Sequence, residues 1–185
     1  MTNAPMNNGK CGCAGGQNTC SGNGKKARDN FVLTDAERHE IEHAMEHYED
    51  PRAASIDALK TVQKARGWVS DGAIDAIAAV LGIPASDIDG VATFYNRIYR
   101  QPVGRHVISV CDSISCFLTG YEDVRDEMQK QLGIQYGQTT ADGRYTLLPI
   151  CCLGNCDKGP ALMIDDDTHG PIAPTDVAKL LEQYK

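Results

Sequence analysis

The chain has 185 residues, of which 42% are hydrophobic and 23% charged, and its formal net charge is −7. These values are ordinary for globular proteins and allow one ample domain or two small ones. The acidic balance, with no run rich in lysine and arginine, argues against a nucleic-acid partner, which requires a basic face. No apolar run approaches the length of a membrane span, and the N-terminus shows no apolar secretory segment. We therefore expect a cytoplasmic protein.

Eight cysteines are the most informative part of this composition. In a reducing compartment they are more often metal ligands or redox groups than disulfides. Three of them, Cys11, Cys13 and Cys20, lie within residues 1–29, which are rich in Gly, Asn and Lys and nearly empty of large apolar side chains. Such a segment cannot bury enough surface to offset its ordering entropy. We expect a disordered tail whose thiols have no fixed role, with an additional metal or redox site as the alternative.

Residues 30–102 carry the pattern of a small helical bundle. Thr34 and Glu37 fit a capping box at the start of the first helix, and Ser55 is the expected cap of the second. The periodicity of apolar residues and the positions of Gly and Pro predict helices over about 35–48, 56–67, 71–81, 84–90 and 91–99.

Three histidines in the first helix, His39, His43 and His47, repeat every four residues like a ladder of metal ligands. At about 100° per residue they point away from the apolar face of that helix, so we expect a solvated face and no metal. Trp68, in a turn between two helices, is expected to fill the core of the bundle, with an anchor for a partner as the alternative.

The pattern changes to strands and helices over residues 103–185. Strands are expected at 105–110, 144–150 and 161–164, helices at 121–132 and from Thr175 onward, and a short edge strand near Ile172. The aspartates at 165–167 are expected to form a hairpin turn, because they lack the alternation of a calcium loop. The whole chain therefore has the pattern of an α+β protein, a helical bundle followed by an α/β domain.

Two cysteine pairs organise this second part. Cys111 and Cys116 have four residues between them, and Cys152 and Cys156 have three. Each pair follows a predicted buried strand, so the four thiolates can converge on one point. Four cysteine thiolates are the ligand set of a [2Fe-2S] cluster. Structural zinc is the alternative, but these gaps lie at the wide end of zinc spacings, so the pattern favours iron–sulfur.

The motifs around these cysteines closely resemble those of the thioredoxin-like [2Fe-2S] ferredoxin subunit of respiratory NADH:quinone oxidoreductase (complex I), which is the E subunit of the bacterial enzyme. The resemblance covers about residues 31–185 and rests on three stretches in the family's order: His47–Ser55, Gly90–Tyr95 and Leu148–Pro160. It implies a thioredoxin-like fold for residues 103–185 and one [2Fe-2S] cluster, with one iron for each cysteine pair in the simplest arrangement. The N-terminal cysteines depart from the family pattern.

The resemblance also implies a setting for the chain. In the family a partner subunit carries FMN, binds NADH and takes the hydride, and the ferredoxin subunit docks on it in the peripheral arm of a membrane-bound complex. We therefore expect a place on the cytoplasmic face of the inner membrane, with no direct membrane insertion. The sequence has no arrangement of a catalytic acid, base or nucleophile and no glycine fingerprint for a dinucleotide. The chain alone should only accept and donate single electrons.

Three other functions remain open at this point. Very similar chains serve as diaphorase subunits of NAD-linked hydrogenases and formate dehydrogenases. A zinc-stabilised adaptor without a redox role would use the same cysteines. A free thioredoxin-like ferredoxin would not need the added helical part, which favours a permanent docking surface.

Cys151 and Cys152 are adjacent, and neighbouring residues that leave a strand point in opposite directions. Only one of them can face the cluster, and the spacing of the family's motif selects Cys152. We expect Cys151 to be a small buried hydrophobic residue. We also expect Ser113, Ser115 and Gly154 to direct hydrogen bonds toward the sulfur atoms.

Overall fold

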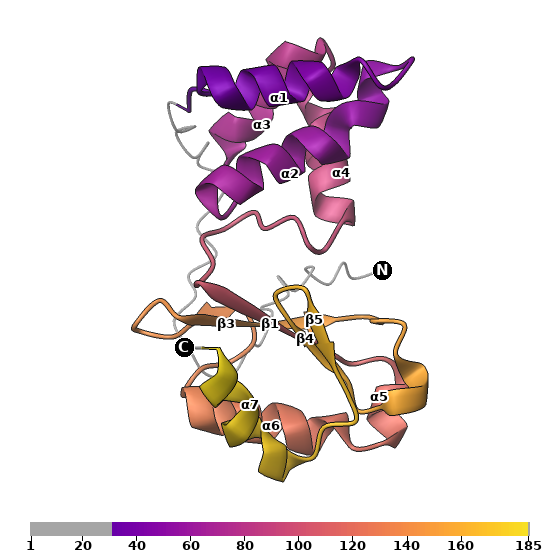
Figure 1. Cartoon of the computed structure of the whole chain (residues 1–185), viewed down its shortest axis with the longest axis vertical. Coiled ribbons are helices and arrows are strands. Elements are labelled where there is room, and N and C mark those ends of the chain that lie inside the picture. Colours follow the sequence, from indigo (N-terminus) through magenta and orange to yellow (C-terminus); the bar gives the residue numbers. More distant parts are fainter. Residues whose placement is uncertain (1–30, 185) are drawn as a thin grey trace, which may run out of the picture.

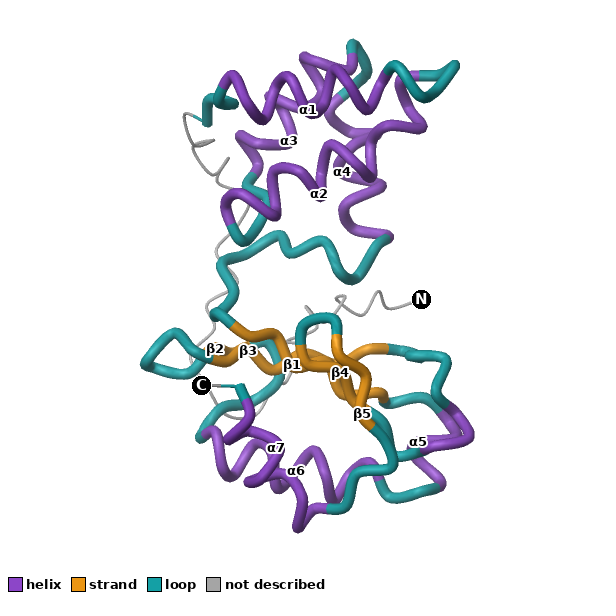
Figure 2. The backbone as a smooth tube through the Cα atoms, viewed as in Figure 1, coloured by secondary structure: helices purple, strands orange, loops and turns teal. Residues whose placement is uncertain are grey.

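The computed structural model describes residues 31–184. It has a helical part, from α1 to α4, and a sheet part that begins with β1 (His106–Cys111); a linker over 95–105 joins them (Figure 1, Figure 2). The α+β class expected from the sequence is confirmed. None of the helices between residues 31 and 184 combines the length and the apolar character needed to cross a membrane.

The helical part contains α1 (Asp35–Met45), the 3₁₀ helix η1 (Pro51–Ala54), α2 (Ser55–Arg66), α3 (Asp71–Leu81) and α4 (Ala85–Phe94). The predicted capping box is confirmed: Thr34 Oγ1 accepts from Glu37 N at 3.2 Å, and the Glu37 carboxylate accepts from Thr34 N at 2.7 Å. Each reciprocal bond satisfies an amide that has no partner within the helix. Gly67 ends α2 with a φ of 82°, in the left-handed region that favours glycine.

Two details of the first helices differ from the expectation. Ser55 does not cap α2; it is buried in the first turn, where its Oγ donates to the Arg52 carbonyl at 2.6 Å. The capping residue is instead Asp50, which caps η1: its side chain accepts a hydrogen bond from Arg52 N. The first helix ends at Met45, before the expected Tyr48.

The fourth helix also differs. It runs through Gly90 to Phe94, so the two short helices expected over 84–99 are one helix followed by a turn, in which Ile98 N donates to the Tyr95 carbonyl. The reason for the early end lies elsewhere in the chain: the Tyr99 carbonyl accepts from Val69 N at 2.8 Å, and Tyr99 N donates to Gln63 at 2.7 Å. These long-range bonds hold the segment after α4 against the end of α2.

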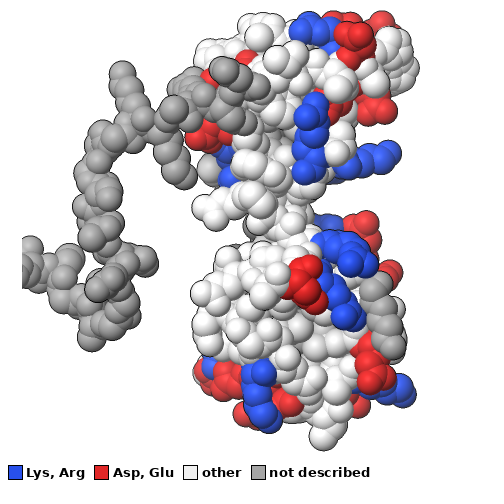
Figure 3. All heavy atoms as spheres, turned by 90° about the vertical axis from the view of Figure 1, so that its left-hand side faces the viewer, with Lys and Arg blue, Asp and Glu red and all other residues white. Residues whose placement is uncertain are grey.

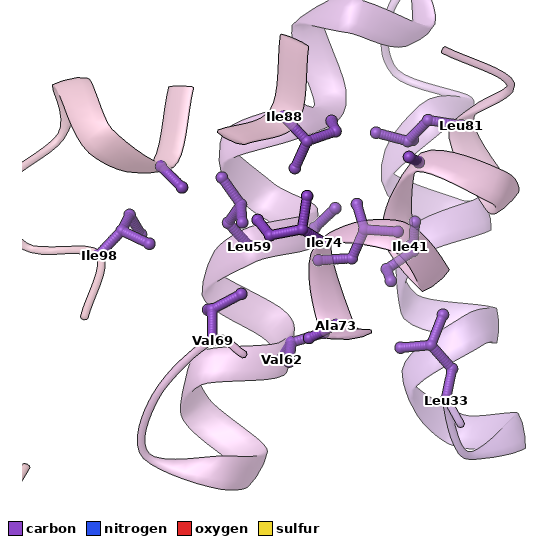
Figure 4. Close-up of a cluster of buried hydrophobic side chains, with 14 of the residues drawn as sticks. Leu33, Ile41, Leu59, Val62, Val69, Ala73, Ile74, Leu81, Ile88 and Ile98 are labelled. Carbon is purple, nitrogen blue, oxygen red and sulfur yellow. The ribbon is translucent and has the colours of Figure 1, made fainter. Parts of the chain in front are cut away.

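The core of the helical part is formed by side chains from all four α-helices (Figure 4). Its largest fully buried members are Ile41, Leu59, Val62, Val69, Ile77 and Ile88. Trp68 is only half-buried and lies outside this core, so the prediction for it was wrong. His39 and His43 on α1 and His47 just after it are exposed, as expected.

The sheet has five strands in the order β2-β3-β1-β4-β5. The remaining strands are β2 (Gln138–Thr139), β3 (Tyr145–Ile150), β4 (Leu162–Ile164) and β5 (Asp167–His169). Of the four strand pairings within residues 31–184, that of β1 with β3 is parallel and the other three are antiparallel. The expected edge strand near Ile172 is therefore β5, which ends three residues earlier.

Two helices, α6 (Tyr121–Leu132) and α7 (Val177–Gln183), pack on one face of the sheet, on the side away from the helical part (Figure 1). The core between these two helices and the sheet includes Ile108 and Leu147, which are paired across β1 and β3. Met128 from α6 and Leu180 from α7 complete it. Alternation along the strands brings these residues to the same face.

The linker and the β4–β5 turn meet where the two parts join. Arg97 Nη2 donates to the Asp165 carbonyl at 2.9 Å and to the Asp166 carboxylate at 2.7 Å. Asp165 has a φ of 53°, and its carboxylate accepts from Val107 N at 2.9 Å. Acidic and basic side chains are both visible around this narrow junction (Figure 3). A cavity of about 640 Å³ lies there, and none of the five described cysteines lines it.

Candidate iron–sulfur site

The parallel strands β1 and β3 end at the same edge of the sheet. Cys111, the last residue of β1, is in register with Ile150, the last residue of β3. The pairing continues past the strands, because Asp112 N donates to the Ile150 carbonyl at 3.1 Å. The two cysteine-bearing loops therefore begin side by side, although about 40 positions of sequence separate them.

The first loop contains a short helix that the sequence pattern did not predict, α5 (Ile114–Leu118). Cys111 and Cys116 are both buried, with 2% and 1% of their surface exposed. Cys111 N donates to the Ala161 carbonyl at 3.1 Å, which fixes the start of the loop against the segment before β4.

The second loop leaves its cysteines exposed. Gly154 has a φ of 76°, so the chain turns back at this point and the Gly154 amide approaches Cys152 Sγ at 3.4 Å. Cys156 begins the 3₁₀ helix η2 (Cys156–Lys158). The Sγ atoms of Cys152 and Cys156 are 3.8 Å apart.

The two loops influence each other electrostatically. The Gly154 amide lowers the pKa of Cys152, and the thiols of Cys156 and Cys111 lower it further. Cys152 raises the pKa of Cys156 through their shared hydrogen bond and through charge repulsion. Burial raises the pKa of Cys116, with added contributions from Cys111 and Cys156. The two loops also touch, because Cys111 Sγ of the first loop lies 3.7 Å from the Cys151 carbonyl of the second.

The expected hydrogen-bond donors also lie here. Gly154 donates to a sulfur atom directly. Ser113 contributes to the lowered pKa of Cys152, and Ser115 opposes the rise in the pKa of Cys156. Backbone and hydroxyl donors near thiolates are the groups that adjust the potential of an iron–sulfur centre.

Cys151 differs from the expectation. It is exposed, not buried. Its backbone rather than its thiol takes part in the site, because the Cys151 carbonyl lies 3.7 Å from Cys111 Sγ. The strand β3 ends at Ile150, and Cys151 and Cys152 after it are both exposed, so the alternation of a strand does not continue past Ile150. Cys11, Cys13 and Cys20 lie outside the described residues.

The four cysteines divide into two pairs, one in each loop. Among residues 31–184, no three histidine, cysteine or acidic side chains surround one point as ligands of a single metal ion. A [2Fe-2S] cluster does not require that arrangement, because its two irons divide four thiolates between them. The residues that would be divided in this way are the pair in the second loop, whose Sγ atoms are 3.8 Å apart, and the two buried thiols of the first loop.

Three exposed apolar side chains lie beside the cysteines, and the sequence pattern did not single them out. Ile114, Phe117 and Leu118 on α5 are 68%, 50% and 76% exposed. The sequence contained a signal for the helix that carries them, because a serine followed by large apolar residues next to Cys116 fits a short helix as well as a loop. An apolar surface next to a redox site is a feature of partner recognition.

Comparison with known proteins agrees with this geometry. The thioredoxin-like [2Fe-2S] ferredoxin family matches residues 41–185. The chain belongs to this family, and the resemblance drawn from the cysteine motifs is confirmed. The family indicates one [2Fe-2S] cluster, as expected.

Close relatives have a more specific name. The E subunit of NADH-quinone oxidoreductase from Pseudomonas aeruginosa is 72% identical over 84% of this chain and 94% of its own length. The corresponding protein from Escherichia coli, which has the same name, is 66% identical over 84% of this chain and 93% of its own length. Both relatives are oxidoreductase subunits, in agreement with the expectation for this chain.

A solved structure shares the fold. The crystal structure of an NAD⁺-reducing [NiFe]-hydrogenase in the air-oxidized state matches 68% of this chain with a TM-score of 0.58 and 24% identity. This chain spans only 22% of that hydrogenase chain. At this level of identity the match supports the fold alone.

Proposed function

We propose that this chain is the E-type subunit of an NADH:quinone oxidoreductase and holds one [2Fe-2S] cluster through Cys111, Cys116, Cys152 and Cys156. The observation that carries the proposal is the pairing of the parallel strands, which brings the two cysteine loops to one edge of the sheet. The identity to the two bacterial relatives over nearly their whole length supports the particular complex.

The residues of the chain would do three things at this site. The thiolates would hold the irons, since coordination favours the deprotonated form. The Gly154 amide would donate to Cys152 and stabilise negative charge there. Burial of Cys111 and Cys116 would keep water from one side of the centre. When bound, the cluster supplies one-electron redox chemistry.

The partner expected next to this site is the subunit that binds FMN and NADH, together with other subunits of the peripheral arm. The exposed cysteines of the second loop and the apolar residues of α5 lie on adjoining segments, so a partner that covers α5 would also approach the cluster. This arrangement supports docking through α5. Through that complex the chain would lie on the cytoplasmic face of the inner membrane, and the complete active site would belong to the complex.

We also propose a division of the chain into a helical domain, 30–102, and a ferredoxin domain, 103–185, after a tail over 1–29. Two separate hydrophobic cores support it, because no buried residue belongs to both. The helical domain then adds docking surface without contributing a ligand.

The test is the metal content and spectrum of the purified full-length chain. We expect two irons and two sulfides per chain, visible absorption, and an EPR signal after reduction. One zinc per chain with neither signal would overturn the proposal in favour of the zinc-stabilised adaptor. Copurification from the native source then tests the complex, because a nickel- or molybdenum-containing subunit would assign the chain to a hydrogenase or formate dehydrogenase instead.

A further inference from the structure

The loop that carries Cys156 has no room for a side chain where it crosses α5. A Cβ atom added to Gly159 would lie 2.7 Å from Thr119 Oγ1, a separation that real Cβ atoms essentially never show. It would also lie 3.7 Å from the Cα of Cys116. The backbone of the second loop therefore rests directly on the helix that carries a cysteine of the first loop.

The contact atom, on the residue that follows α5, is itself held in place. Thr119 Oγ1 donates to the Ser115 carbonyl at 3.0 Å and to the Cys116 carbonyl at 3.2 Å. The hydroxyl therefore cannot rotate away from Gly159 without loss of its bonds to the backbone around Cys116. A displacement at Gly159 would act on that backbone.

The same loop is also confined by a second segment of the chain. A Cβ atom added to Gly170, in the segment after β5, would collide with the Lys158 carbonyl oxygen and lie 3.1 Å from Asn155 Nδ2. Asn155 and Lys158 flank Cys156 on its two sides. The turn that presents the Cys156 thiol is thus fixed between α5 and the segment after β5.

We propose that Gly159 is a positioning residue for the metal centre. Its missing side chain lets the Cys156 loop approach Cys116 closely, and this approach sets the separation between the two thiolate pairs. The inference rests on the proposed function, because it takes these cysteines as ligands. The potential and spectrum of a cluster depend on its ligand environment, so both should respond to the separation.

The experiment compares three variants of the full-length chain with the natural sequence. Gly159→Ala introduces the methyl group, and the double variant Thr119→Ala with Gly159→Ala removes the oxygen that the methyl group would meet. After that removal the nearest neighbour of the new methyl group is the Ser115 carbonyl oxygen at 3.6 Å, an ordinary contact. Gly90→Ala is the matched control, because an added Cβ there has no neighbour within 4 Å. The readouts are iron and sulfide per chain, the EPR spectrum, the midpoint potential and the thermal unfolding temperature.

We expect Gly159→Ala to change the EPR spectrum and to shift the potential by more than Gly90→Ala does, and we expect the double variant to restore both. A natural spectrum and potential in Gly159→Ala, or no recovery in the double variant, would overturn the inference. If Gly159→Ala does not accumulate as folded chain, Thr119→Val replaces the oxygen with a larger methyl group at the same contact. It should then shift the spectrum where Thr119→Ser does not, and equal spectra would refute the inference.

These outcomes separate the inference from the function on which it rests. If the natural chain lacks iron and sulfide, the proposed function fails and the inference fails with it. If the natural chain holds the cluster and Gly159→Ala behaves like Gly90→Ala, only the positioning role is lost.

Discussion

The Arg97 guanidinium donates to the Asp166 carboxylate at 2.7 Å, and this bond connects the linker after α4 with the turn between β4 and β5. The same Nη2 reaches the Asp165 carbonyl, so one side chain spans both parts of the molecule. The contact is exposed, and an exposed ion pair contributes only about 0–1 kcal/mol. The bond matters more for the relative orientation of the helical and sheet parts than for the free energy of unfolding.

Arg97→Ala should therefore leave the free energy of unfolding within about 1 kcal/mol of the natural value. It should also let the helical and sheet parts tumble more independently. Rotational correlation times from ¹⁵N relaxation, measured separately for the two parts, should diverge in the variant. Arg38→Ala is the control, because within residues 31–184 the ion pair of Arg38 is with Glu42 of the same helix, at 3.9 Å. Equal correlation times in Arg97→Ala would show that the linker alone fixes the orientation.

The second prediction concerns acid stability. The Arg66 guanidinium bonds to Glu37 at 2.8 and 2.9 Å and, with the helix cap at Thr34, lowers the pKa of Glu37 from 4.5 to about 2. A lowered pKa in the folded state stabilises the fold above pH 4.5, and this contribution is lost as the pH falls from about 4.5 to about 2. Glu37 is buried but the Arg66 side chain is partly exposed to solvent, which screens the pair, so the full loss is at most about 3 kcal/mol.

Glu37→Gln should remove this part of the pH dependence and destabilise the chain at neutral pH, because it breaks the ion pair and weakens the cap. Urea unfolding at a series of pH values measures both effects. Glu40→Gln, an exposed change on the same helix, should keep the natural slope. A Glu37→Gln chain with that same slope would contradict the assignment of the acid transition to Glu37.

The third prediction separates two adjacent cysteines. Cys151→Ser should retain the full iron and sulfide content, because only the Cys151 carbonyl reaches the site. Cys152→Ser should lose the cluster or change its EPR spectrum, since the Cys152 thiol lies next to Cys156 and accepts from Gly154. Loss of the signal in Cys151→Ser alone would reverse the assignment of the ligand.

The fourth prediction tests the docking surface. Leu118 is 76% exposed on α5, so Leu118→Glu should not disturb the fold of the isolated chain. It should reduce copurification with the FMN- and NADH-binding subunit, because a carboxylate would be buried in an apolar contact. The matched control is Val32→Glu, at an apolar residue 78% exposed before α1. Equal recovery of the partner by both variants would exclude α5 as the docking surface.

Local signals in the sequence predicted much of this structure. Thr34 and Glu37 identified a helix start because a capping box involves residues only three apart. The strand before Cys111 and the strand before Cys152 followed from short apolar runs. Their convergence followed from the need of four thiolates for one centre, and the motif spacing indicated the family.

Contacts between distant residues account for the errors. The helix expected over 91–99 stops at Phe94 because Tyr99 pairs with Val69 and Gln63, which no local pattern reveals. Cys151 is exposed because the strand geometry ends one residue before it. The contact of Gly159 with Thr119 could not be predicted either, because the sequence around a loop glycine does not indicate which residues it contacts.

The parallel pairing of β1 with β3 has a consequence for biogenesis. A nascent polypeptide released only as far as Cys116 possesses two of the four proposed sulfur donors, and the other two emerge roughly 40 residues later. Metal delivery must then wait until translation has passed Cys156 and the central strands have associated. A maturation factor would thus meet a folded acceptor, so mutations that slow strand association should yield iron-free protein even when every cysteine is intact.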